Sequence, residues 1–177
     1  MRMWARRGFL TTSTLTLAIM SQAGGARADM DSATAAYERG DYDQAFTEFR
    51  ALADSGDSLA ILWVGYLHEQ GQGTAQNYGE AMHHYRQAAD LGNSEAPFYL
   101  ANLHYGGLGV AQDRIEAARW YRRGAESGNA SCQYALGVMH EDGDGAPRDR
   151  RAARRWYEAA AAQGHGDAQA ALQRLED

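Results

Sequence analysis

The sequence contains no lysine, since all 17 of its basic residues are arginines. This absence excludes a P-loop lysine, a Schiff-base lysine and the Ser-x-x-Lys arrangement of serine acyl-enzymes. Proline is also scarce, with two residues in 177, while 45% of the residues are hydrophobic, a composition that favours a folded, helical chain. The single cysteine, Cys132, cannot form an intramolecular disulfide, so packing alone must stabilise the fold.

Acidic residues are absent from the first 28 positions, which contain four of the arginines. In the remainder of the chain, 13 arginines stand against 23 acidic residues, which gives a formal net charge of −10. A surface this negative repels nucleic acid and anionic lipid, so we expect neither as a partner.

Residues 1–28 have the three parts of an export signal: a basic start, the short apolar segment 9–20 and a small-x-small cleavage site at 26–28. Twelve residues rise only about 18 Å as a helix, which is too short to span a bilayer. We therefore predict cleavage after Ala28, no membrane span afterwards, and a periplasmic or secreted protein.

The run Arg6-Arg7-Gly8-Phe9-Leu10 resembles the twin-arginine export motif. It departs from that motif at Ala5, where Ser or Thr is usual. A general secretory (Sec) signal that happens to contain paired arginines is the alternative.

The rest of the chain repeats with a period of 36 residues, shown by glycine, alanine and tyrosine positions that recur in step. The clearest set is Gly56, Gly92, Gly128 and Gly164. We predict three repeats at 57–92, 93–128 and 129–164, preceded by a tetratricopeptide-like hairpin at 29–56 and followed by a capping helix at 165–177.

Each repeat has the pattern of two helices. In the second repeat, Ala96, Leu100 and Leu103 fall on one side of a helix. Polar residues suited to N-cap positions precede the second helices, and glycines suited to the C′ position follow them. The expected N-cap residues are Asn77, Asp113 and Asp149, with Asp57, Asn93 and Asn129 before the first helices. The predicted fold is all-α: an α/α superhelical solenoid of antiparallel helix pairs.

This pattern resembles the Sel1-like repeat family. The second repeat matches it best, at Ala96, Leu100, Leu103, Gly107, Gly109, Val110, Asp113, Ala117, Trp120, Tyr121, Ala125, Gly128 and Asn129. The chain departs from the family at His68, His104 and His140, where Tyr is usual, and at His84, where Trp is usual. The resemblance implies a superhelix used for protein–protein contacts, often in bacterial envelope or signalling assemblies.

We predict no metal, no cofactor and no catalytic residue. His68, His104 and His140 recur every 36 residues, but stacked helices lie roughly 8–10 Å apart, whereas zinc ligands lie about 2.0–2.1 Å from the ion. A partly buried ring hydrogen-bonded near a loop is the simpler interpretation. Cys132 occupies an alanine position of the repeat, which indicates a small buried residue.

The residues that do not repeat suggest a partner-binding site. Helical phase places Trp63, Tyr66, Tyr99 and Asn102 away from the core positions of their helices, on the predicted concave surface. Their equivalents in the third repeat are Ala135 and Val138. Exposed aromatic residues are frequent at binding hot spots. The alternative for Trp63 is packing against the preceding hairpin.

The prediction is therefore a non-enzymatic module that binds a protein or peptide partner in the cell envelope on its concave face. An envelope hydrolase is one alternative, because some cysteine-rich members of the resembled family are described as β-lactamase-like, although they carry paired cysteines that this chain lacks. Binding of a glycan or small molecule is the other. The arginines at 148–155 form a basic patch that contrasts with the acidic segment 29–70.

Overall fold

The computed structural model describes residues 24–176 of the chain, with side chains described from Met30 to Leu175. Within this part, the fold consists of nine helices without a strand: α1 (Gly24–Glu38), α2 (Tyr42–Asp54), α3 (Ser58–Gln70), α4 (Tyr78–Asp90), α5 (Ala96–Gly106), α6 (Arg114–Glu126), α7 (Ala130–Asp142), α8 (Arg150–Ala162) and α9 (Gly166–Glu176). Most of the predicted export signal lies outside the described residues.

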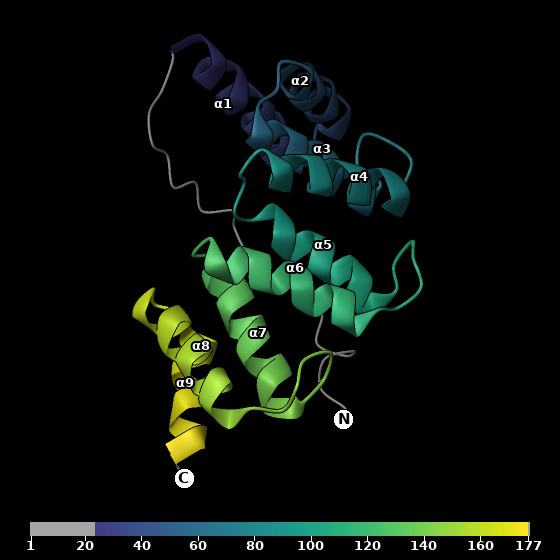
Figure 1. The fold of residues 1–177 in the computed structure, drawn as a ribbon. Coiled ribbons are helices and arrows are strands. Elements are labelled where there is room, and N and C mark those ends of the chain that lie inside the picture. Colours follow the sequence, from purple (N-terminus) through teal and green to yellow (C-terminus); the bar gives the residue numbers. More distant parts are fainter. Residues whose placement is uncertain (1–23, 177) are drawn as a thin grey trace.

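Each helix packs on the next one along the chain, so the helices form a single curved stack. Figure 1 shows this stack descending from α1 and α2 to α8 and α9 in sequence order. The three predicted repeats correspond to the pairs α3–α4, α5–α6 and α7–α8, with the α1–α2 hairpin and the lone α9 at the ends. The predicted all-α solenoid is confirmed.

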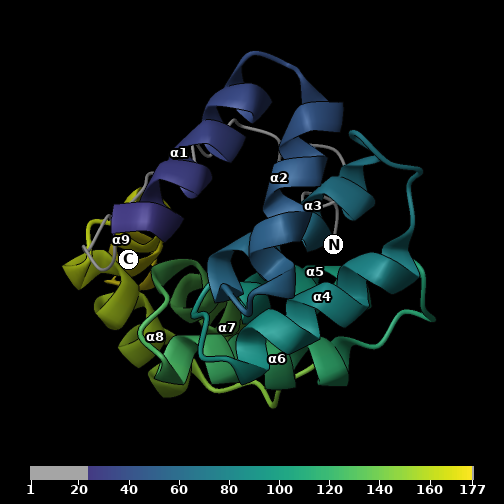
Figure 2. The same cartoon turned by 90° about the horizontal axis from the view of Figure 1, so that it is seen from above.

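The stack has an inner and an outer side. In the view of Figure 2, α3, α5 and α7 follow the inner side of the curve and α4, α6 and α8 its outer side. Helices α5 and α7 also contact each other directly across the repeat boundary. The first helices of the repeats therefore form the concave face.

The predicted capping residues begin and end the helices. The side chain of Asp57 accepts hydrogen bonds from the amides of Leu59 and Ala60, both at 2.9 Å, and Asn77, Asp113 and Asp149 cap the second helices in the same way. The glycines that follow those helices have left-handed backbone, for example φ +87° at Gly92.

Helix α5 begins later in its repeat than α3 and α7. At the corresponding position of those helices, Ile61 and Gln133 donate their amides to the carbonyl of the N-cap residue. Pro97 has no amide hydrogen to donate, so the helix starts at Ala96 instead. Asn93 still accepts hydrogen bonds from the first amides, those of Glu95 and Ala96.

The core runs along the stack as a series of apolar clusters, each drawn from neighbouring helix pairs. Its largest fully buried side chains include Phe49, Tyr85, Leu100 and Tyr157. The apolar side of each repeat is thus covered by its neighbours, as stacking of repeats requires.

Candidate partner-binding face

A file of three tyrosines crosses the inner side of the stack from α1 to α5. The ring centroids of Tyr37 and Tyr66 lie 6.2 Å apart, and those of Tyr66 and Tyr99 are also 6.2 Å apart. All three side chains are partly buried. Two of the four predicted site residues, Tyr66 and Tyr99, therefore lie side by side, and Tyr37 adds a third ring that the repeat pattern did not indicate.

Trp63 is not part of an exposed strip. It is 6% exposed, stacks on Phe49 at 5.0 Å with an interplanar angle of 4°, and lies 4.9 Å from the ring of Tyr37. The expectation that its ring is exposed is wrong, and the alternative, packing against the preceding hairpin, is confirmed. The cause is that α3 is covered by α2 on the side that helical phase leaves free.

Trp63 nevertheless contributes to the predicted site, because it packs against Tyr66 from the core side. Its ring meets the edge of Tyr66 at 5.8 Å, with an interplanar angle of 84°. Tyr99 has similar support, because it stacks on the buried ring of Tyr85 at 5.2 Å. Tyr66 and Tyr99 each pack against a buried aromatic ring.

Two carboxylates flank Tyr99, and the sequence pattern did not point to either of them. Burial raises the pKa of the Tyr99 phenol, and the negative charges of Glu95 and Glu69 raise it further. Glu69 accepts a hydrogen bond of 2.6 Å from the hydroxyl of Tyr85. Burial raises the pKa of Glu69, although the bond from Tyr85 opposes this effect.

Asn102 lies on the same helix as Tyr99 and accepts a hydrogen bond from the hydroxyl of Tyr121. This contact is specific to the second repeat. In the first and third repeats the corresponding tyrosines instead donate to Glu69 and Glu141, each at 2.6 Å. The position of these two glutamates is occupied by Tyr105 in the second repeat.

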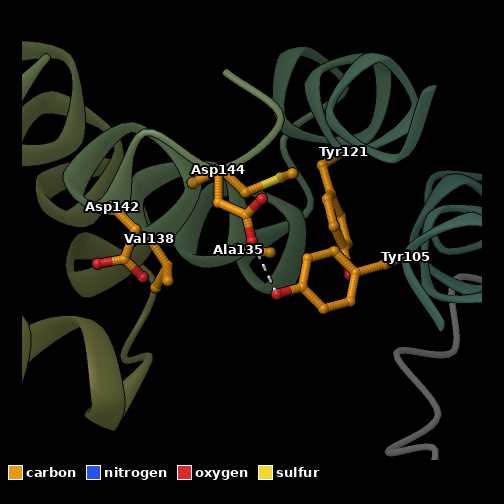
Figure 3. Close-up of a pocket in the computed structure, with 7 residues that line it drawn as sticks. Tyr105, Tyr121, Ala135, Val138, Asp142 and Asp144 are labelled. Carbon is orange, nitrogen blue, oxygen red and sulfur yellow. Dashed lines mark hydrogen bonds between the residues drawn. The ribbon is translucent and has the colours of Figure 1, made fainter. Parts of the chain in front are cut away.

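The face continues into a small cavity between the second and third repeats (Figure 3). The cavity holds about 20 Å³, room for about one water molecule. Its lining residues are Tyr105, Tyr121, Ala135, Val138, Met139, Asp142 and Asp144. Ala135 and Val138 are the third-repeat equivalents of Tyr99 and Asn102, so the cavity lies on the continuation of the predicted surface.

Asp144 is held at the edge of this cavity by two contacts. The hydroxyl of Tyr105 donates to its Oδ2 at 3.2 Å, and Arg114 Nη1 lies 2.8 Å from its Oδ1. The pKa of Tyr105 is raised by burial first and by the charge of Asp144 second. Asp142, at the end of α7, is exposed.

The three repeated histidines have different surroundings. His140 is buried and its Nδ1 lies 2.9 Å from the carbonyl oxygen of Pro147, whereas His68 stacks on His84 at 5.7 Å. Both ring nitrogens of His104 are buried without a hydrogen-bond partner in the described structure. Among the described residues, no three His, Cys, Asp or Glu side chains are grouped so that they could hold a metal ion.

The sulfur of Cys132 is inaccessible. The residue is fully buried, as its alanine position predicted, and burial raises the pKa of its thiol. A buried, protonated thiol is a poor nucleophile.

The basic patch at 148–155 contributes to local structure. Arg148 donates to the carbonyl of Glu141 at 3.2 Å, Arg150 donates to the carbonyl of Leu175, and Arg154 pairs with Glu158 at 2.9 Å. The remaining members, Arg151 and Arg155, are exposed. Three of the five arginines thus serve helix ends or a pair within one helix.

The geometry defines an α/α solenoid of 36-residue helix pairs with a concave face on its first helices. The Sel1 repeat model matches residues 58–93, 94–129 and 130–165, with each match starting one residue after the repeat start deduced from the sequence. The chain belongs to the Sel1 repeat family.

Solved structures of this family resemble the chain. A Sel1 repeat protein from Oxalobacter formigenes superposes with a TM-score of 0.78 and 30% identity over 86% of this chain and 62% of that one. The protein c5321, a protective antigen of uropathogenic Escherichia coli with an SLR fold, gives 0.73 and 35% identity over 80% of this chain and 31% of that one. The chain therefore spans less than two thirds of either structure's length.

Helicobacter pylori cysteine rich protein B shares the fold, with a TM-score of 0.60 and 19% identity over 75% of this chain and 95% of that one. Comparison with curated protein sequences gives no match. No helix in the described part of the chain combines the length and the apolar character needed to cross a membrane.

Proposed function

We propose that this protein is a non-enzymatic interaction module that holds a peptide or protein segment on its concave face. The observation that carries the proposal is the continuous surface from Tyr66 and Tyr99, past Asn102, to the cavity beside Val138. These residues come from the first helices of three successive repeats.

The physical basis is the combination of aromatic area and rigidity. Tyrosine buries a large area with little loss of side-chain entropy and offers a hydroxyl for hydrogen bonding. The rings of Tyr66 and Tyr99 rest on Trp63 and Tyr85, so their positions are set before a partner arrives. Preorganisation of this kind lowers the entropy cost of association.

The residues favour binding over catalysis. Proteins of the Sel1 repeat family are typically scaffolds without catalytic activity. A β-lactamase-like hydrolase, the first alternative, would lack the paired cysteines of the cysteine-rich members, because Cys132 is the only cysteine and it is buried. Binding of a glycan to the same tyrosines is the other alternative, and the experiment below separates it from binding of a protein.

We also propose that the module acts in the periplasm or outside the cell, because of the basic start, short apolar segment and small-x-small site in residues 1–28. The N-terminus of the exported protein is expected at Asp29, which protein sequencing checks. Replacing Arg6-Arg7 with Lys-Lys is expected to block export. Export of this variant at the normal level would assign the protein to the Sec route.

The binding face is tested by the double variant Tyr66→Leu/Tyr99→Leu. Both rings pack partly on the core, so leucine is chosen to keep apolar volume while it removes the planar rings and hydroxyls. We expect near-normal helicity and a loss of roughly 2 kcal/mol or more in partner affinity, as for hot-spot residues.

The matched control is Leu91→Ala/Ile115→Ala, which removes exposed apolar side chains of α6 and of the end of α4. Partners are captured from envelope extract with each variant and identified by mass spectrometry, with and without deglycosylation. Equal capture by the two variants would place the site elsewhere, and the exposed arginines of the 148–155 patch are the next to replace. Loss of capture on deglycosylation would favour glycan recognition.

A further inference from the structure

We propose that the segment held on the concave face is cationic, so that Arg or Lys side chains of the partner lie between tyrosine rings and carboxylates. This inference rests on the proposed function and names the chemistry of its partner.

The first observation is that, among the helices of the three repeats, arginine occurs only in the second helix of each pair. Helices α3, α5 and α7 contain no arginine. The paired helices α4, α6 and α8 carry nine: Arg86, Arg114, Arg119, Arg122, Arg123, Arg150, Arg151, Arg154 and Arg155. Since α4, α6 and α8 follow the outer side of the curve (Figure 2), the positive charge of the repeats is concentrated there.

The charged residues of the inner helices are acidic. They are Glu69 on α3 and Glu141 and Asp142 on α7, joined by Glu95 just before α5 and Asp144 just after α7. Two of these carboxylates have arginine neighbours from elsewhere in the fold: Arg114 pairs with Asp144 at 2.8 Å, and Arg174 lies 3.6 Å from Glu141. No ion pair among the described residues includes Glu69, Glu95 or Asp142. These three carboxylates are therefore the ones proposed to receive the partner's positive charge.

The strongest local arrangement surrounds Tyr99. Glu69 and Glu95 both act on this ring electrostatically, and Tyr66 lies against it. Burial raises the pKa of each glutamate, so a cation bound beside them would favour their charged form. A guanidinium or ammonium group over the tyrosine rings would gain a cation–π contact and pair with both carboxylates.

A second position lies at the mouth of the cavity in Figure 3. Asp142 is exposed there, and the side chain of Asp144 is 28% exposed. The cavity itself, at about 20 Å³, is too small for a guanidinium group, and the ring of Tyr105 already has the guanidinium of Arg114 at 5.4 Å, so a partner's cation would bind outside the cavity, beside Asp142. The two positions lie on successive repeats, an arrangement that an extended segment crossing the helices can follow.

Charge complementarity selects this partner over the alternatives. An acidic segment would bring like charges together at Glu69, Glu95 and Asp142, which costs binding energy. A neutral segment would bury those carboxylates without a counter-charge. A cationic segment avoids both the repulsion between like charges and the burial of unpaired carboxylates.

The test measures binding of a fluorescein-labelled peptide of alternating Arg and Ser by fluorescence anisotropy, beside a peptide in which Gln replaces Arg. The inner-face variant is Glu69→Gln/Glu95→Gln/Asp142→Asn, which removes three charges while keeping side-chain size. The control, Asp43→Asn/Glu80→Gln/Glu126→Gln, removes three exposed charges from α2, α4 and α6.

We expect the Arg peptide to bind wild type in preference to the Gln peptide, and to bind the inner-face variant roughly tenfold more weakly. The control variant is expected to bind like wild type. Circular dichroism melting confirms that each variant is folded. Equal weakening in both variants would show diffuse attraction to an acidic protein and would overturn the proposal, as would equal binding of the Arg and Gln peptides.

The two proposals fail in different ways. If the Tyr66→Leu/Tyr99→Leu variant loses a captured partner while the inner-face charge variant retains it, the face is a binding site but the partner is not held by its charge. If the tyrosine variant retains the partner, the site lies elsewhere and the concave face is wrong as the binding surface, so both proposals about that face fail.

Discussion

The first and third repeats share an arrangement that the second repeat lacks. Tyr85 lies against Gly65 and donates to Glu69, and Tyr157 lies in the same way against Gly137 and donates to Glu141. A Cβ atom at Gly65 would lie 2.9 Å from the ring of Tyr85, and one at Gly137 only 2.6 Å from the ring of Tyr157. These glycines make room for the rings.

In the second repeat the same position is Ala101, so its Cβ would collide with a ring placed in that way. Tyr121 accordingly donates to Asn102 instead, and Tyr105 occupies the glutamate position. Both tyrosines then line the cavity beside Asp144. The methyl group of Ala101 and the loss of the glutamate acceptor thus accompany a redirected tyrosine and a locally different concave face.

Among the variants that test this difference between the repeats, Gly137→Ala is expected to lower the stability most. The added methyl group would overlap the ring of Tyr157, which is fully buried. We expect a loss of about 2–3 kcal/mol in unfolding free energy, as for an overpacked core, measured by urea denaturation. The converse change, Ala101→Gly, is expected to cost only about 1 kcal/mol, from helix propensity. A larger loss for Ala101→Gly than for Gly137→Ala would contradict the packing argument.

A second difference between the repeats is compensated within the core. Where the other repeats pair Ala88 with Ala96 and Ala160 with Ala168, the chain has Gly124 and Cys132. A Cβ atom on Gly124 would lie 2.4 Å from the sulfur of Cys132. The glycine thus makes room for the larger thiol.

This pairing predicts a rescue. Gly124→Ala alone is expected to cost about 2 kcal/mol through overpacking, and Cys132→Ala alone about 1 kcal/mol through lost packing. The double variant restores the alanine pair of the other repeats and should recover most of the loss of Gly124→Ala. Pro97, whose Cβ would lie 3.2 Å from the new methyl group, accounts for the remainder. Additive losses in the double-mutant cycle would show that the two residues do not compensate each other.

The glycines at the ends of the second helices are required because of their backbone conformation and not because a side chain would lack space. Gly92 has φ +87°, and a Cβ atom added there would meet no other atom within 4 Å. Gly92→Val is therefore expected to cost roughly 1–2 kcal/mol through the left-handed conformation, as measured by thermal unfolding. A neutral result would mean that the helix end can rearrange without strain.

The last of these predictions concerns the reactivity of Cys132. Its side chain is fully buried, like the alanines at the equivalent positions of the other repeats. Burial raises the pKa of the thiol, so it stays protonated through neutral and mildly alkaline pH. We expect no reaction with Ellman's reagent at pH 8 until denaturant unfolds the protein. Rapid reaction of the native protein would show that this part of the stack opens.

Much of the fold followed from the 36-residue spacing. The capping roles of Asn77, Asp113 and Asp149 depend on short-range chemistry, and the sequence shows that chemistry directly. The burial of Trp63 could not be predicted in this way. Helical phase assigns a helix one buried side, but α3 packs against helices on more than one side, so its buried residues run almost without interruption from Ala60 to Leu67.

The site was predictable only in part. Non-repeating aromatic residues pointed to Tyr66 and Tyr99, which lie together. The carboxylates beside Tyr99 were missed, because Glu69 and Glu95 lie at unrelated positions of two different repeats and only the packing of α3 on α5 brings them to the same ring. Tyr121 packs in one cluster with Ala101, 20 positions away in the sequence, and donates to Asn102. The repeat pattern alone does not reveal this arrangement.

Contact between the concave tyrosines and the partner is tested most directly by site-specific photo-crosslinking. A photoreactive p-benzoylphenylalanine is placed at Tyr66 in one variant and at Ile115, which is 61% exposed on α6, in another. We predict a covalent adduct to the partner from position 66 and none from position 115 after irradiation of cells that produce each variant. An adduct from position 115 alone would contradict a binding site on the concave face.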